Sequence, residues 1–202
     1  MIIGVSGKIG AGKSTFSQLA VKEFGAKRVA FADAVKEEVT EYLKSIKVPF
    51  KKANLYGTQD EKAQGFVLTP RFFDAVSGPS HELYLFLMQH PNTTLTFRFL
   101  MQWWGTEYRR AQDPDYWVKK AFEKCWGGGI HIIDDVRFKN EAEAVLAADG
   151  WLVRVNRKGH TGKHASEIDL DDYDHWDKVI KNNGDLKAYR AAVRLFLEEV
   201  TC

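Results

Sequence analysis

One stretch near the start of the chain is the strongest indicator of its fold: Gly7-Lys8-Ile9-Gly10-Ala11-Gly12-Lys13-Ser14-Thr15. It reads G-x-x-x-x-G-K-[ST] from Gly7 to Ser14. Glycines in such a loop let the backbone wrap around an anion and turn successive N–H groups toward it. Lys13 can reach the β- and γ-phosphates of a nucleotide, and the Ser14 hydroxyl can ligate Mg²⁺. The alternative interpretation is a glycine-rich turn that binds nothing.

The segments on both sides of this loop supply the context that the motif requires. Ile2-Ile3-Gly4-Val5 is a short apolar run suited to a buried strand, and residues 16–24 carry an apolar helical face. The N-terminus of that helix would present its dipole to the phosphates. The order of strand, loop and helix favours a nucleotide-binding loop, with ATP contacts from Gly10, Ala11, Gly12, Lys13, Ser14 and Thr15.

Length and composition limit the class of protein. The chain has 202 residues, and its 29 Lys and Arg against 27 Asp and Glu give a net charge of +2, which is no footprint for nucleic acid. No apolar run approaches the ~18 residues of a membrane span. Cys125 and Cys202 show neither metal spacing nor a disulfide framework. We expect a cytoplasmic protein (host cytoplasm if viral) with no secretory signal and no membrane or stable nucleic-acid partner; a homodimer is left open.

Apolar and polar patterning predicts alternating strands and helices. Strands are expected at 2–5, 27–32, 130–133, 151–155 and 178–180, with helices at 33–45, 82–89, 96–110, 114–126, 140–148 and 186–200. Asp33 suits the N-cap of its helix. Residues 48–80 contain several Pro and Gly and are expected to form loops with brief helices. The alternation indicates an α/β fold, a five-stranded parallel sheet wrapped by helices.

One connection is far longer than the fold requires. About a hundred mostly helical residues separate the second and third strands, whereas a crossover needs only ~12. We therefore expect a single domain over 1–202 with a helical insertion at about 34–127 that binds a second substrate, and a lid loop at about 156–168.

Asp134 and Asp135 follow a buried strand, at the place where α/β folds bind ligands. An acid there can hold Mg²⁺ or its waters opposite Ser14, and Asp134, nearer the strand, is the favoured metal partner. Asp135 and Arg137 are then expected to face the other substrate. The alternative is that one of the two aspartates only caps the next helix.

Arg137 and Glu141 share one turn after that strand, with Asn140. An arginine beside a phosphate site makes bidentate contacts, which favours a role in catalysis for Arg137. The alternative is an ordinary i,i+4 helix pair worth only about 0.3 kcal/mol.

The segment 156–168 is polar, glycine-containing and basic, with Arg157, Lys158, His160, Lys163 and His164. Such a loop suits a lid that closes over the transferring phosphates and excludes water, with Arg157 as a catalytic cation. A solvated surface loop is the alternative. The histidines lack the spacing of metal ligands.

The insertion carries candidate acceptor contacts. Arg71, Arg98, Arg109 and Arg110 are possible phosphate clamps, and Trp103, Trp104 and Trp117 could stack on a base, although Trp104 fits an apolar core face. Gly105-Thr106 permits close backbone approach. Lys8 adds a cation, and Asp33 and Lys36 follow the second strand, where contact with the acceptor competes with a cap and a surface lysine.

The chain resembles the deoxynucleoside monophosphate kinases of bacteriophages, within the wider nucleoside monophosphate kinase group of P-loop kinases. The resemblance spans nearly the whole length and is carried by residues 7–15, 31–36, 103–107 with 109–117, 135–141 and 164–167. Some of these segments also resemble phosphomevalonate and dephospho-coenzyme A kinases. A dephospho-coenzyme A kinase or other small-metabolite kinase therefore remains an alternative, as does a P-loop ATPase or nucleotide-binding module without an acceptor.

The resemblance implies transfer of the γ-phosphoryl group from ATP·Mg²⁺ to a deoxynucleoside 5′-monophosphate (dNMP), giving dNDP and ADP for DNA precursor synthesis. It implies that Asn183, within 182–184, borders the adenine. The acceptor contacts that it implies, with Asp33 and Glu141 added from their positions, are Lys8, Val35, Lys36, Arg71, Arg98, Gly105, Thr106, Trp117, Asp135 and Arg137.

Overall fold

The computed structural model describes residues 1–159 and 168–201 and divides the chain into two compact units. The first unit contains Met1–Phe31 and Val118–Cys202, and the second contains Ala32–Trp117. Residues 160–167, which include most of the expected lid at 156–168, lie outside the described residues. No helix in the described part of the chain is long and apolar enough to cross a membrane.

The first unit is built on a parallel sheet of five strands in the order β2-β3-β1-β4-β5. The strands are β1 (Ile2–Ser6), β2 (Lys27–Val29), β3 (His131–Val136), β4 (Trp151–Asn156) and β5 (Lys178–Lys181). Ile3 of β1 pairs with Ile132 of β3 and with Trp151 of β4. The predicted fold class, a five-stranded parallel sheet wrapped by helices, is confirmed. Because β1 is the central strand, the loop that follows it starts at the middle of the sheet, at the carboxyl ends of the strands.

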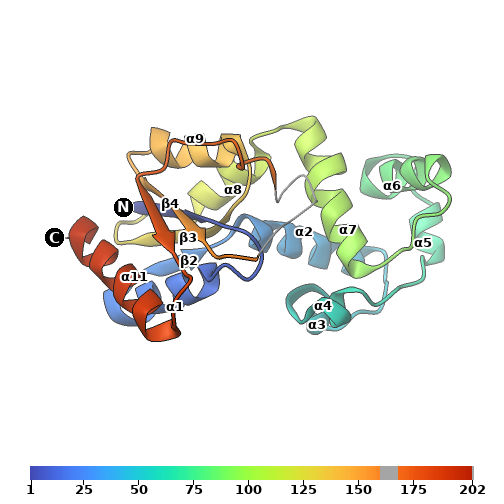
Figure 1. Cartoon of the computed structure of the whole chain (residues 1–202). Coiled ribbons are helices and arrows are strands. Elements are labelled where there is room, and N and C mark those ends of the chain that lie inside the picture. Colours follow the sequence, from blue (N-terminus) through green and yellow to red (C-terminus); the bar gives the residue numbers. More distant parts are fainter. Residues whose placement is uncertain (160–167, 202) are drawn as a thin grey trace. The chain divides into compact units, whose positions relative to one another are not determined.

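Helices cover both faces of this sheet (Figure 1). On one face α1 (Lys13–Phe24) and α11 (Leu186–Thr201) bury Phe16 and Phe196 against sheet residues that include Val5 and Val153. On the other face α9 (Lys139–Ala147) packs so closely that a Cβ on Gly4 would lie 2.9 Å from Val145. The sheet is therefore buried on both sides, as its nearly continuous apolar strands require.

The second unit is helical. It contains α2 (Phe31–Ser45) from its second residue on, α3 (Lys52–Tyr56), α4 (Gln59–Lys62), α5 (Pro70–Phe73), α6 (Gly78–Gln89), α7 (Phe97–Trp103), the π-helix η1 (Trp104–Arg110) and the start of α8 (Tyr116–Glu123). Its aromatic core includes Trp103 and Tyr108, whose rings stack with centroids 5.4 Å apart. The short helices α3, α4 and α5 lie within residues 48–80, where loops with brief helices were predicted.

Several boundaries differ from the sequence prediction. The second strand ends at Val29 rather than at 32, and α6 begins at Gly78 rather than at 82. β3 continues to Val136, so Asp134 and Asp135 lie inside this strand rather than after it.

Two further differences have a clear physical reason. The predicted N-cap at Asp33 is wrong, because α2 begins at Phe31 and the Phe31 N–H donates instead to Oδ1 of Asp135, at 2.9 Å. The helix predicted at 96–110 changes at Trp104 from α- to π-helical hydrogen bonding. In both cases a partner distant in the sequence, Asp135 or the packing around Trp104, replaces the local signal.

Candidate active site

The loop after β1 is held in a tight turn by hydrogen bonds to its own backbone. The Ala11 N–H donates to the Lys8 carbonyl at 3.1 Å, and Gly12 precedes α1 with φ +117°, a value that favours glycine. A Cβ on Gly7 would lie 2.5 Å from the Val155 carbonyl oxygen, so that position also requires glycine. The Lys13 ammonium donates to the carbonyls of Gly7 at 2.5 Å and Lys8 at 3.1 Å. The lysine is thus folded over the loop that would hold a phosphate.

A cavity of about 330 Å³ opens beside this loop. Lys13 and Ser14 line it at the N-terminus of α1, where the N–H groups of a first helical turn and the helix dipole favour an anion. The remaining lining residues are Gly10, Gly12, Thr15, Arg157, Asn182, Gly184, Leu186 and Tyr189. The expected ATP contacts therefore surround one cavity within the first unit, apart from Ala11 and Asn183, which adjoin it in the sequence.

Two residues from the C-terminal part of the chain, which also line the cavity, bind the backbone of the loop. Asn182 Nδ2 donates to the Ala11 carbonyl at 2.7 Å, and the Tyr189 hydroxyl donates to the Gly12 carbonyl at 2.9 Å. Burial raises the pKa of Tyr189, so its hydroxyl stays protonated and remains a donor at neutral pH. Sequence reasoning missed Tyr189, whose spacing predicts only a helix face.

The described part of the expected lid touches the same loop. Arg157, expected to act in catalysis, lines the cavity and donates through Nη1 to the Gly10 carbonyl at 3.2 Å. The Lys158 N–H donates to Oδ1 of Asn183 at 2.9 Å. The side chain of Asn183 therefore connects to the chain after β4, while its neighbours Asn182 and Gly184 line the cavity.

Asp134 has the chemistry of a metal ligand. It is 5% exposed, and its Oδ2 accepts from Ser17 Oγ at 2.6 Å and from Arg28 Nε at 2.8 Å. Its Oδ1 is buried with no hydrogen-bond partner within residues 1–159 and 168–201. A buried carboxylate oxygen without a partner is costly, and a cation would satisfy it. Asp134 therefore fits Mg²⁺, and Ser17, one turn after Ser14, orients it.

The carboxylates of Asp135 and Glu141 accept hydrogen bonds from backbone N–H groups in this structure. Asp135 caps the first turn of α2 through Phe31, as described above. Glu141 is 2% exposed, and its Oε2 accepts from the N–H groups of Arg137 at 2.7 Å and Phe138 at 3.1 Å. These bonds fix the turn that carries Arg137, so Glu141 holds the arginine's backbone in place.

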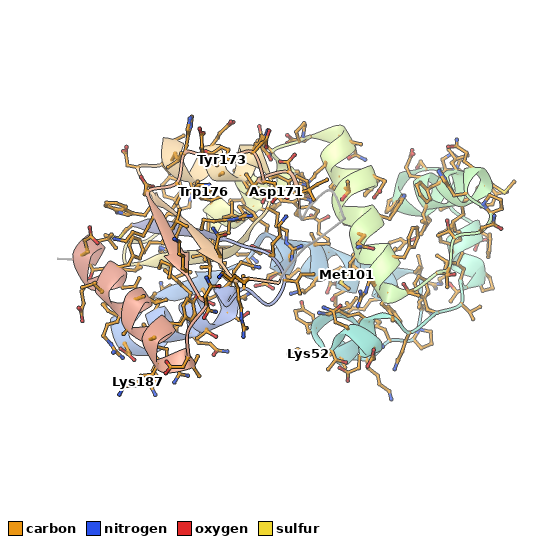
Figure 2. The ribbon with its side chains drawn as sticks, in the orientation of Figure 1. Lys52, Met101, Asp171, Tyr173, Trp176 and Lys187 are labelled. Atoms are coloured by element: carbon orange, nitrogen blue, oxygen red, sulfur yellow. The ribbon has the colours of Figure 1, made fainter. Side chains whose placement is uncertain are left out.

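Three cations meet in a small pocket on the other flank of the loop. Lys8, Arg137 and Arg154 line it together with Gly7. Asp171 pairs with Lys8 at 2.5 Å and with Arg154 at 3.4 Å, and Arg154 lies 5.3 Å from the ring centre of Trp176. Figure 2 labels Asp171 and Trp176. The structure thus brings together two predicted acceptor contacts, Lys8 and Arg137, and adds Arg154, which sequence reasoning missed because it lies inside a predicted strand.

In the second unit, two groups of predicted acceptor residues are assembled. Lys36 Nζ pairs with Asp33 at 2.9 Å and lies 5.2 Å from the ring centre of Tyr56. A Cβ on Gly105 would lie 3.7 Å from Val35, and the Trp117 indole N–H donates to the Gly105 carbonyl at 2.8 Å.

The other residues of the second unit that were predicted to contact the acceptor either bond elsewhere or are exposed. Arg98 donates to the Gln59 carbonyl at 2.9 Å, and Arg71 and Thr106 are exposed. Trp103, Trp104 and Trp117 are 3%, 3% and 2% exposed. The core interpretation of Trp104 therefore holds, and none of the three rings offers an open face for stacking.

A glycine-rich loop between β1 and α1, with Lys13 and Ser14 beside a cavity, defines a P-loop on a parallel α/β sheet. A family model described as deoxynucleotide monophosphate kinase matches residues 50–193. The chain belongs to the deoxynucleotide monophosphate kinase family. The matched residues do not include the P-loop, so loop and family are independent observations.

Known proteins give further comparisons. A relative from Acanthamoeba polyphaga mimivirus, named "Putative deoxynucleotide monophosphate kinase", is 25% identical over 202 residues, covering 96% of this chain and 94% of its own. TT1252 from Thermus thermophilus is 17% identical with a TM-score of 0.45, over 100% of this chain and 98% of its own. Dephospho-CoA kinase from Campylobacter jejuni is 17% identical with a TM-score of 0.44, and the match covers 98% of this chain and 96% of that one. Shikimate kinase from Bacteroides thetaiotaomicron is 12% identical with a TM-score of 0.47, and the match covers 100% of this chain and 99% of that one.

Proposed function

We propose that this protein transfers the γ-phosphoryl group of ATP to the 5′-phosphate of a deoxynucleoside monophosphate, giving dNDP and ADP. The observation that carries the proposal is the P-loop cavity with Lys13, Ser14 and Arg157 on its lining, in a chain of the deoxynucleotide monophosphate kinase family. In such a site the loop N–H groups and Lys13 would bind the triphosphate of the donor.

The reaction needs positioning and charge balance more than proton transfer. An oxygen of the acceptor phosphate forms a bond to the γ-phosphorus, and the bond from that phosphorus to the β–γ bridging oxygen breaks. The electron pair of the broken bond leaves with ADP. Because a phosphate dianion is already ionised, no strong base is required, and catalysis comes from alignment and from cations around the transferring group.

The first unit supplies those cations. Lys13, which donates to the Gly7 and Lys8 carbonyls here, would exchange them for phosphate oxygens of the donor. Arg157 would contribute from the start of the lid segment, and Lys8 and Arg137 would bind the acceptor phosphate with help from Arg154. Mg²⁺, bound with ATP, would be held by Ser14 and Asp134 and would neutralise charge on the β- and γ-oxygens.

The second unit supplies candidate contacts for the rest of the acceptor. Asp33 and Lys36 form an ion pair in the first half of α2. A Cβ on Gly105 would lie 3.7 Å from Val35, and the buried Trp117 holds the Gly105 carbonyl through its indole N–H. We assign this group to the deoxynucleoside part of the acceptor. Gly105 suits that role, because a residue without a side chain permits close approach of a ligand to the backbone.

A coupled assay of ADP release tests the proposal. ATP·Mg²⁺ is supplied with each deoxy- and ribonucleoside monophosphate in turn, with dephospho-coenzyme A, and with no acceptor. We expect release that depends on a dNMP. Equal release without acceptor would indicate an ATPase, no release a binding module, and faster release with dephospho-coenzyme A another kinase. In parallel, Lys13→Ala should abolish transfer while circular dichroism and the thermal midpoint stay near those of the wild type.

A further inference from the structure

One carboxylate in the second unit collects three donors. Glu38 of α2 accepts through Oε2 from Trp104 Nε1 at 2.9 Å and from Arg109 Nε at 2.8 Å. Its Oε1 accepts from the Tyr116 hydroxyl. The side chain of Glu38 is 21% exposed, so these are charge-assisted bonds in a partly desolvated place, where they are stronger than in water.

The three donors lie at the ends of one irregular segment. Trp104 and Arg109 are the first and sixth residues of the π-helix Trp104–Arg110, and Tyr116 begins α8. π-Helical turns are rare, are less favourable than α-helix and are concentrated at functional sites, so they persist where other contacts hold them. The Arg109 guanidinium also lies 5.0 Å from the ring centre of Tyr108 and 4.8 Å from that of Tyr116. Glu38 therefore fixes this turn from outside the segment.

The donors adjoin the residues assigned to the acceptor. Trp104 immediately precedes Gly105, and Tyr116 immediately precedes Trp117. Glu38 itself is three residues after Val35 on α2, and Val35 packs against Gly105. One carboxylate thus ties together the three segments that carry Val35, Gly105 and Trp117.

We propose that Glu38 is a positioning residue for the acceptor, a proposal that rests on the proposed function. Its carboxylate holds the π-helical turn and the start of α8 in the arrangement in which the Gly105 backbone, bonded to the buried Trp117, is ready for the deoxynucleoside. Glu38 does not touch the substrate in this account; it removes the cost of ordering these segments when the acceptor binds.

Replacing Glu38 by Gln tests this role, because the amide keeps the size and removes the charge and one acceptor atom. The matched control is Glu41→Gln, one turn further along α2, whose carboxylate is 73% exposed and pairs with Lys44. Dissociation constants for dAMP, dCMP, dGMP and dTMP, and separately for ATP, are measured by calorimetry. We expect Glu38→Gln to weaken dNMP binding about tenfold and to change ATP binding by less than twofold. Glu41→Gln should change neither.

Two further readouts separate positioning from a loss of stability. Tyr116→Phe removes a single donor to Glu38 and should weaken dNMP binding about threefold with the fold retained. If Glu38→Gln does not fold, the dNMP affinity of Tyr116→Phe tests the positioning role in its place. In Glu38→Gln the indole N–H resonance of Trp117, which has no bond to Glu38, should shift together with that of Trp104.

The opposing results are distinct. The inference is wrong if folded Glu38→Gln, or Tyr116→Phe in its place, binds every dNMP as the wild type does, or if dNMP and ATP affinities fall equally. A wild-type protein that binds no dNMP would contradict the proposed function itself, and this inference with it.

Discussion

The Tyr189 hydroxyl donates to the Gly12 carbonyl at 2.9 Å, across 177 positions of sequence. Asn182 does the same for the Ala11 carbonyl. In a trans peptide the C=O and the following N–H point in opposite directions. Holding these two carbonyls therefore fixes the N–H groups of Gly12 and Lys13 on the opposite side. Tyr189 of α11 and Asn182, the residue after β5, thus set the geometry of the P-loop.

Tyr189→Phe should weaken ATP binding by roughly three- to tenfold and lower the free energy of unfolding by about 1 kcal/mol, because it removes one buried hydrogen bond without changing the ring. Affinity for the acceptor should not change. Calorimetric titration with ATP and chemical denaturation check this. Tyr84→Phe, at a tyrosine that is 42% exposed on α6, is the control and should have no effect. Unaltered ATP affinity in Tyr189→Phe would remove the tyrosine from the site.

Gly12→Ala should cost more than an ordinary glycine substitution. Gly12 has φ +117°, and a Cβ there would lie 2.6 Å from Asn182 Nδ2 and 3.0 Å from the Tyr189 ring. We expect a loss of about 2–3 kcal/mol in unfolding free energy and ATP binding weakened more than tenfold. Gly25→Ala is the control: its φ is +64° with nothing within 4 Å of the added Cβ, so about 1 kcal/mol of strain and unchanged ATP binding are expected. Equal effects at both positions would argue against the contacts described here.

Arg137→Ala should raise the KM for the dNMP about tenfold or more and leave the KM for ATP nearly unchanged, because Arg137 lies with Lys8 and Arg154 in the basic pocket. Initial-rate measurements with each substrate varied in turn give both values. Arg194→Ala, which breaks the exposed pair with Glu23 on the surface of α11, serves as the control. If the acceptor kinetics of Arg137→Ala match those of the wild type, Arg137 does not bind the acceptor.

Stability should fall on mild acidification because of His131. Its side chain is 1% exposed, Nε2 is buried with no partner in the described part of the chain, and burial lowers its pKa below 6.5. Above pH 6.5 both folded and unfolded chains carry the neutral ring, so the stability is fully present. Below pH 6.5 the imidazole is protonated in the unfolded chain but stays neutral in the folded chain. The free energy of unfolding therefore falls by up to about 1.4 kcal/mol per pH unit until the pH reaches the pKa of His131 in the folded chain.

Urea denaturation at pH 5.5 and at pH 7.5 measures that loss. His131→Leu should show a smaller difference between the two conditions, because it lacks the titrating group. The same difference in the variant and in the wild type would assign the acid sensitivity to other residues.

Much of the fold could be predicted because its signals are local. Apolar runs marked all five strands, and the glycine-rich motif marked the P-loop between the first strand and helix. The errors arose where a distant residue replaced a local signal. Asp135 on β3, not Asp33, caps the start of α2, and hydrogen bonds that reach Glu38 accompany the π-helix, which the residue pattern of a continuous helix does not reveal.

Local sequence signals specify the P-loop, the parallel sheet and the acidic pair near the end of β3, because backbone freedom at glycine and the alternation of apolar runs act over a few residues. The folded arrangement adds what surrounds them: Tyr189 and Asn182 bonded to the loop carbonyls, Arg154 in one pocket with Arg137, and Glu38 bonded to Trp104 and Arg109 of the π-helix. These contacts join residues far apart in the chain, and a side chain's spacing along the sequence carries no information about the partner that folding brings to it.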